Sequence, residues 1–207
     1  PSPAVGLHPE LVAHLAFNSG GVDPHHDSDF ERGPPRFSGG LSAAWDLDPD
    51  RFVEPSLRLA AEALVKVRGF SASGALYLAF ASSGERIDDQ RFAMFGGLLQ
   101  ASYLLLPKIE LSARYAVVSI DDDLRRHAAG RAAQLVAAAP DEARAELLAR
   151  YEEAGRLRWE QEATLGVNVY LFGRSLRWRS DLSWLLQSWA DGDRDQVRFR
   201  TQLQLAY

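Results

Sequence analysis

Arginines recur at every second position near the C-terminus. Arg177 and Arg179 are separated by one residue, and so are Arg198 and Arg200. Side chains two positions apart in a strand lie on the same face, so each pair would present two guanidinium groups together. A guanidinium group binds phosphate through two parallel hydrogen bonds, which an ammonium group cannot do. The spacing predicts an anion-binding surface, with one alternative: the arginines pair with carboxylates such as Asp181 and only line a solvated wall.

The residues around the second arginine pair predict the strand that would carry it. Residues 197–207 alternate, so that Val197, Phe199 and every second residue after them lie opposite the arginines. The length matches the roughly 9–11 residues that a tilted strand needs to cross the hydrocarbon of a membrane. The stretch ends on Tyr207 and resembles the closing strand of bacterial outer-membrane β-barrels.

Eight earlier stretches show the same period of two. They are 10–17, 36–47, 56–67, 70–80, 94–106, 108–119, 163–172 and 175–189. None of their apolar faces carries a charged residue. A Lys or Arg near the bilayer midplane costs roughly 2–4 kcal/mol, so this pattern is typical of a lipid-facing surface. Tight turns are expected at Arg68-Gly69, Pro107 and Gly173-Arg174.

These stretches predict an all-β fold, an antiparallel up-and-down transmembrane β-barrel with about nine strands visible as part of a larger barrel. Residues 1–207 would form a single barrel domain or a barrel fragment. Aromatic girdles at the two membrane interfaces are expected on the apolar face. Their members would be Trp45, Tyr103, Tyr115, Trp178, Trp184 and Tyr207. A soluble barrel is the alternative, with the same charge-free face pointing inward.

One region departs from the alternation. In 122–158, apolar residues recur every three to four positions, Pro140-Asp141 marks a break and a helix start, and Gly155 marks a stop. We expect a helical hairpin, inserted at 121–160 in an external loop. It would constrict the mouth, act as a lid, contact a partner or be a passive insertion. Residues 48–55, 82–92 and 190–196 would be loops on the same side, and 18–35 would lie on the opposite side.

Composition excludes several classes of function. The formal charge is 23 − 28 = −5, which argues against a general nucleic-acid binder, and there is no cysteine for thiolate chemistry or thiolate metal sites. No nucleophile–base motif or phosphate-cradling glycine loop is present, so we expect no enzyme activity, no cofactor and no metal. No run of 18 apolar residues predicts a membrane helix. Any signal peptide is removed or lies outside this chain.

The polar faces carry the residues expected to line a pore. These faces carry ten basic residues and only four acidic ones, Asp46, Glu62, Glu110 and Asp181. Rings of Arg and Lys in a water-filled pore select for anions or phosphate. The predicted pore-lining and anion-binding residues are Arg58, Lys66, Lys108, Arg114, Arg177, Arg179, Arg198 and Arg200.

Three strings and a loop resemble the C-terminal half of the phosphate-selective porin O and P family. The strings are 63–71, 105–115 and 165–171, and the loop is the Asp-rich one that ends at 29–31. The resemblance implies a passive anion or phosphate channel in the bacterial outer membrane, commonly a sixteen-stranded trimer. Its partners would be outer-membrane lipid and lipopolysaccharide, small anions, and other copies in a homotrimer or larger membrane assembly. The chain is shorter than such a barrel.

The predicted function is therefore an outer-membrane porin-like channel for passive diffusion of small anions such as phosphate. The main alternative is a structural or docking barrel within an outer-membrane protein assembly, with little or no transport. The soluble-barrel alternative implies an apolar ligand inside.

Overall fold

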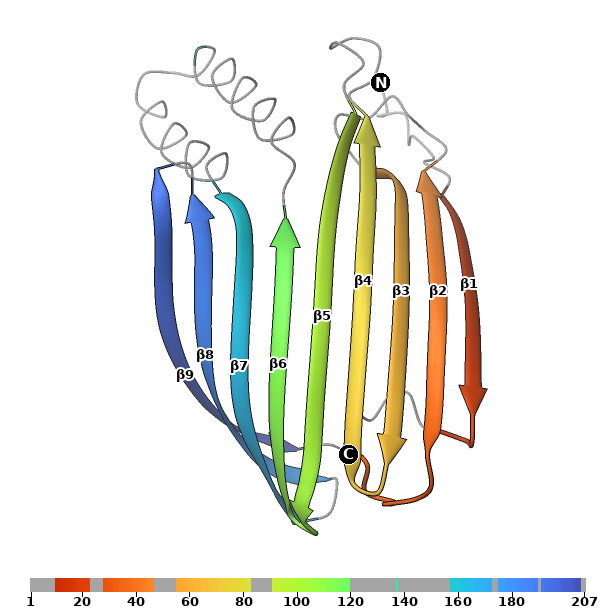
Figure 1. The fold of residues 1–207 in the computed structure, drawn as a ribbon, viewed down its shortest axis with the longest axis vertical. Coiled ribbons are helices and arrows are strands. Elements are labelled where there is room, and N and C mark those ends of the chain that lie inside the picture. Colours follow the sequence, from red (N-terminus) through yellow and green to blue (C-terminus); the bar gives the residue numbers. More distant parts are fainter. Residues whose placement is uncertain are drawn as a thin grey trace, which may run out of the picture.

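The computed structural model describes residues 10–22, 28–46, 55–82, 91–119, 137, 157–172, 175–189 and 191–205. These residues form nine strands (Figure 1). The strands are β1 (Glu10–Ser19), β2 (Arg36–Asp46), β3 (Pro55–Val67), β4 (Phe70–Ser82), β5 (Arg91–Leu106), β6 (Ile109–Ser119), β7 (Leu157–Phe172), β8 (Leu176–Trp189) and β9 (Gly192–Leu205).

Each strand pairs antiparallel with the next along the chain, so the nine strands form one sheet in sequence order. This confirms the predicted all-β, up-and-down topology. Because neighbours alternate in direction, β1 and β9 run the same way, and they form the two edges of the described sheet. Closure of this open sheet into a barrel stays a prediction.

The turn between β3 and β4 is set by two residues with positive φ. Arg68 has φ 48° and Gly69 has φ 89°. Positive φ at both central residues is the mark of the type I′ hairpin turn, whose twist matches that of the strands. The predicted hairpin at Arg68-Gly69 is confirmed. The turn between β5 and β6 comprises Pro107 and Lys108, and the predicted turn at 173–174 lies outside the described residues.

Two predicted loop boundaries are wrong. Residues 157–160 begin β7 and do not belong to a helical insertion, while the rest of 121–160, apart from Ala137, lies outside the described residues. Similarly, β9 begins at Gly192, so most of 190–196 is strand. At the start of β9 both faces are polar, whereas at the start of β7 the apolar face is interrupted only by Gln161. Backbone pairing therefore extends beyond the alternation that marks a strand in sequence.

The two faces of the sheet have reversed burial. The polar face contains buried charged residues, among them Lys66, Glu110 and Asp181, which are at most 4% exposed. On the opposite apolar face, Leu15 and Phe199 are 71% and 68% exposed. Among the described residues, eleven polar or charged side chains are buried against five apolar ones. In this open sheet the apolar face is the exposed one, which is the reverse of the arrangement that the soluble-barrel alternative expects.

Within the described parts of the chain, a helix of the length and apolar character needed to cross a membrane is absent.

Candidate anion-binding site

The strand register brings five arginines to the polar face of β6–β9. Arg114 of β6 is aligned through Thr164 and Ser183 with Arg198 of β9. One row closer to the turns, Arg200 lies opposite Asp181. The arginine cluster comprises Arg114, Arg177, Arg179, Arg198 and Arg200. Of the pairs predicted to meet, Arg179 and Arg200 lie together at Asp181, whereas Arg177 and Arg198 lie at opposite ends of the group, paired with Gln204 and Ser183, and β6 adds a further member.

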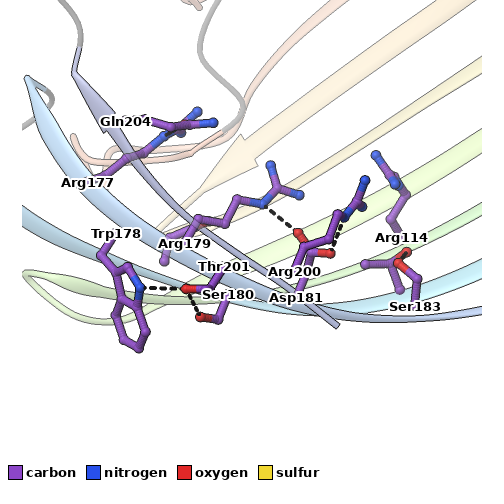
Figure 2. A network of polar contacts seen from close by, with 12 residues as sticks. Arg114, Arg177, Trp178, Arg179, Ser180, Asp181, Ser183, Arg200, Thr201 and Gln204 are labelled. Atoms are coloured by element: carbon purple, nitrogen blue, oxygen red, sulfur yellow. Dashed lines mark hydrogen bonds and ion pairs between the residues drawn. The ribbon is translucent and has the colours of Figure 1, made fainter. Parts of the chain in front are cut away.

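Asp181 holds two arginines at the centre of the cluster. Arg200 donates from Nε to Oδ1 of Asp181 over 2.8 Å, and Nε of Arg179 lies 3.4 Å from Oδ2 (Figure 2). Asp181 is 4% exposed. The carboxylate fixes the two guanidinium groups side by side on neighbouring strands, and it neutralises one of their two charges.

Glu162 is a second carboxylate partner, which was not among the predicted wall residues. It accepts hydrogen bonds from Arg114 Nη2 and Thr164 Oγ1, each at 2.8 Å, and from Ser183 Oγ at 3.1 Å. Arg200 Nη2 lies 3.9 Å away. The signal that finds Glu162 is simple: it precedes Thr164 by two positions and shares its face. Glu162 was missed because the predicted strand began at residue 163, whereas β7 begins at Leu157.

The remaining two arginines have no carboxylate partner among the described residues. Arg177 donates to the neutral Gln204, and Arg198 has no hydrogen-bond or ion-pair partner there. The five guanidinium groups together with their two carboxylate partners, Asp181 and Glu162, carry a net charge of +3, and Glu110 lies in the same row as Arg179, two strands away. Figure 2 places Arg177, Arg179 and Arg200 on one side of the strands and Trp178 on the other.

The other three predicted pore residues lie apart from this cluster. Arg58 of β3 forms an ion pair with Glu10 of β1. Lys66 is buried at the turn end of β3, with 3% exposure. Lys108 lies in the β5–β6 turn and not on a strand wall, because the strand resumes only at Ile109. These three residues do not add to the charge of the arginine cluster.

A second polar group, the turn-end cluster, comprises Glu110, Ser102, Asn168 and Tyr170. Glu110 is 2% exposed and accepts hydrogen bonds from Ser102 Oγ at 2.6 Å, Asn168 Nδ2 at 2.8 Å and Tyr170 OH at 2.6 Å. Its carboxylate is saturated by donors from β5 and β7. This cluster joins β5, β6 and β7, and the amide oxygen of Asn168 is its one buried side-chain atom without a hydrogen-bond partner among the described residues.

The arginine cluster offers what an anion needs: several fixed guanidinium donors with fewer carboxylates than charges. A metal site has no comparable basis, since no group of three or more His, Asp or Glu side chains in the described ranges could hold an ion.

Comparisons of the chain with protein-family models, with curated proteins and with solved structures found no match.

Proposed function

We propose that this chain forms part of a bacterial outer-membrane β-barrel through which small anions such as phosphate diffuse passively. The observation that carries the proposal is the reversed burial of the sheet: several charged groups of the polar face are buried, and large apolar side chains are exposed on every one of the nine strands. In water, so large an apolar surface would require a cover. Lipid provides one without any specific partner.

Aromatic side chains near both ends of the strands support a lipid-facing surface. On the apolar face, five lie within three residues of the turn ends of their strands: Phe17, Phe37, Phe70, Tyr103 and Trp178. Five more lie within five residues of the opposite ends: Trp45, Phe80, Phe95, Tyr115 and Trp184. Phe199, in the middle of β9, is an exception. Aromatic residues near both ends of the strands are the pattern of transmembrane barrels.

The two edge strands support membership of a larger barrel. An unpaired edge in a membrane leaves backbone groups without partners, which costs several kcal/mol for each group. Since β1 and β9 run in the same direction, antiparallel closure requires an odd number of further strands between them. We therefore propose that strands outside the described sheet complete the barrel.

The arginine cluster supports selection for anions. Its charge of +3 faces the enclosed side, where an Arg-lined pore raises the local concentration of anions. Bidentate donors also suit phosphate better than a spherical ion. The likeness to phosphate-selective porins, seen in three short strings, agrees with this choice of solute.

The experiment is the reversal potential in planar bilayers under a KCl gradient, using the full-length protein folded in detergent. We expect a stable conductance with a potential displaced towards that of chloride. Replacing Arg177, Arg179, Arg198 and Arg200 together by Gln should move the potential towards zero or beyond. The matched control is Arg194→Gln, because Arg194 lies on β9 but pairs with Asp191 and stacks on Trp189.

A cation-selective pore, or equal effects of the quadruple and control variants, would overturn the anion proposal. A folded barrel without any conductance would favour the alternative of a structural or docking barrel.

A further inference from the structure

The segment between β1 and β2 is packed against strands that lie far from both. The described part, Ser28–Arg36, is called the inner segment here. Ser28 Oγ lies 2.9 Å from Tyr170 OH on β7, and the ring of Phe30 packs edge-on against the same tyrosine at 4.6 Å. Arg32 donates from Nη2 to the carbonyl oxygen of Leu104 on β5 over 2.8 Å.

Asp29 fixes the inner segment at its other side. The carboxylate is 1% exposed, accepts a hydrogen bond from the Gly69 N–H at 2.7 Å and forms an ion pair with Arg36. Arg36 also pairs with Glu31, and the Arg68 N–H donates to the Gly33 carbonyl oxygen over 3.0 Å. The segment is thus tied to the β3–β4 turn by backbone and side-chain bonds.

These contacts define the path of the segment. β7 is five strands from β2 in the sheet order, and neighbouring strands are about 4.8 Å apart. Tyr170 lies on the polar face, where it donates to Glu110. A segment that starts at β2 and touches Tyr170 therefore crosses the polar face at the turn end of the strands, the lower end in Figure 1.

We propose that the inner segment is the size-determining constriction of the pore, placed at the turn end and in series with the arginine cluster. This inference rests on the proposed function, because a segment that crosses the polar face narrows a pore only if the sheet closes around that segment. The arginine cluster then determines the sign of the charge of the permeating ion, and the inner segment determines the largest solute that can pass. Asp29 holds the inner segment in this position, because its carboxylate binds the Gly69 N–H and the Arg36 guanidinium group. We call this residue the latch of the segment.

The first test is the single-channel conductance of latch variants in the full-length protein. Asp29→Ala removes the bonds to Gly69 and Arg36, while Ser28→Ala removes the hydroxyl group that contacts Tyr170 and Glu110. We expect conductance to rise at least about twofold in Asp29→Ala and less in Ser28→Ala, because a released segment widens the passage. The anion preference should persist, since the arginine cluster is unchanged. Folding of each variant is checked by far-UV circular dichroism.

The second test leaves the latch in place. The chain has no cysteine, so a single one can be introduced as Glu31→Cys, at a side chain that is 58% exposed on the inner segment. Reaction with a negatively charged methanethiosulfonate should lower the conductance. The matched control is Asp191→Cys, at a 49% exposed side chain on the opposite end of the strands, where the same reaction should have little effect.

The outcomes separate the two proposals. An anion-selective conductance that neither the latch variants nor the Glu31 modification changes would overturn the constriction and leave the pore. A silent wild type with conducting latch variants would support a tighter constriction. Absence of conductance from every form would overturn the pore itself, and the constriction with it.

Discussion

The turn-end cluster and the arginine cluster occupy the same face of the sheet, yet they differ in how their charges are paired. Glu110 is 2% exposed and has three donors for one carboxylate. Arg200 is 44% exposed in its side chain and shares Asp181 with Arg179. The turn-end cluster has donors that converge on one charge, whereas the arginine cluster has charges in excess of partners.

The difference separates a structural role from a solvated one. A buried carboxylate needs every one of its hydrogen bonds, because an unpaired buried charge is costly. Exposed guanidinium groups remain hydrated and contribute little to stability, so they are free to interact with solutes. Stability should therefore respond to changes in the turn-end cluster, and selectivity to changes in the arginine cluster.

The largest expected effect is on stability. Glu110→Ala should lower the free energy of unfolding by about 3 kcal/mol or more, because Ser102, Asn168 and Tyr170 lose a charged acceptor at a buried site. Glu162→Ala, in the arginine cluster, should cost only about 1 kcal/mol, since water replaces the lost carboxylate. Urea unfolding in detergent micelles measures both. Equal costs would remove the distinction between the two clusters.

The apolar face provides the reference for both clusters. Leu76 and Tyr77 are neighbours in the middle of β4, are 54% and 51% exposed, and lie on opposite faces. Leu76→Arg should lower the free energy of unfolding in lipid vesicles by about 2–4 kcal/mol, because the charge enters the bilayer. Tyr77→Arg should be nearly neutral. If both substitutions are tolerated equally, the apolar face does not contact lipid.

A smaller effect is expected from the shared carboxylate. Asp181→Asn should raise the preference for chloride over potassium by roughly twofold, because one compensating charge is removed from the arginine cluster. The reversal potential measures it. Asp46→Asn on β2, outside both clusters, is the control, and a shift of the same size there would mean that only the total charge matters.

The smallest effect is the response to salt. Between 0.1 and 1 M KCl the screening length falls from about 10 to about 3 Å, so the anion preference of the exposed arginines should weaken. The stability difference between wild type and Glu110→Ala should change little, because solvent ions do not reach that carboxylate. Salt titrations of both quantities decide this. A salt-dependent Glu110 effect would contradict its burial.

Most of the fold could be predicted from one signal, the alternation of apolar and polar residues. It placed all nine strands and the hairpin at Arg68-Gly69. It failed at the starts of β7 and β9. Asp193, Arg194 and Asp195 continue the pairing of β9 without an apolar face, and Gln161 interrupts the apolar face of β7. Alternation detects a strand only where its two faces meet different surroundings.

The site was predictable in part. Spacing by two residues brought Arg177, Arg179, Arg198 and Arg200 to one face, and the pairing of β8 with β9 follows from their order in the chain. Asp181, the partner of Arg179 and Arg200, could be named from the same spacing. Glu162 could not, because it lies at the start of β7, which the sequence pattern hid. The fold of 28–36 had no periodic signal at all, because its position depends on Tyr170, a contact that only the tertiary structure creates.

The bond between Ser28 and Tyr170 also sets an order of events in folding. Every strand pairs with its neighbour in sequence, so the sheet can grow one hairpin at a time. The Ser28 contact instead joins residues 142 positions apart, and it cannot form until β7 is in place. The segment would therefore dock late, on a nearly complete sheet. A chain that stalls before β7 would leave Ser28, Asp29 and Phe30 without their partners, so protease sensitivity at these residues would report unfinished assembly.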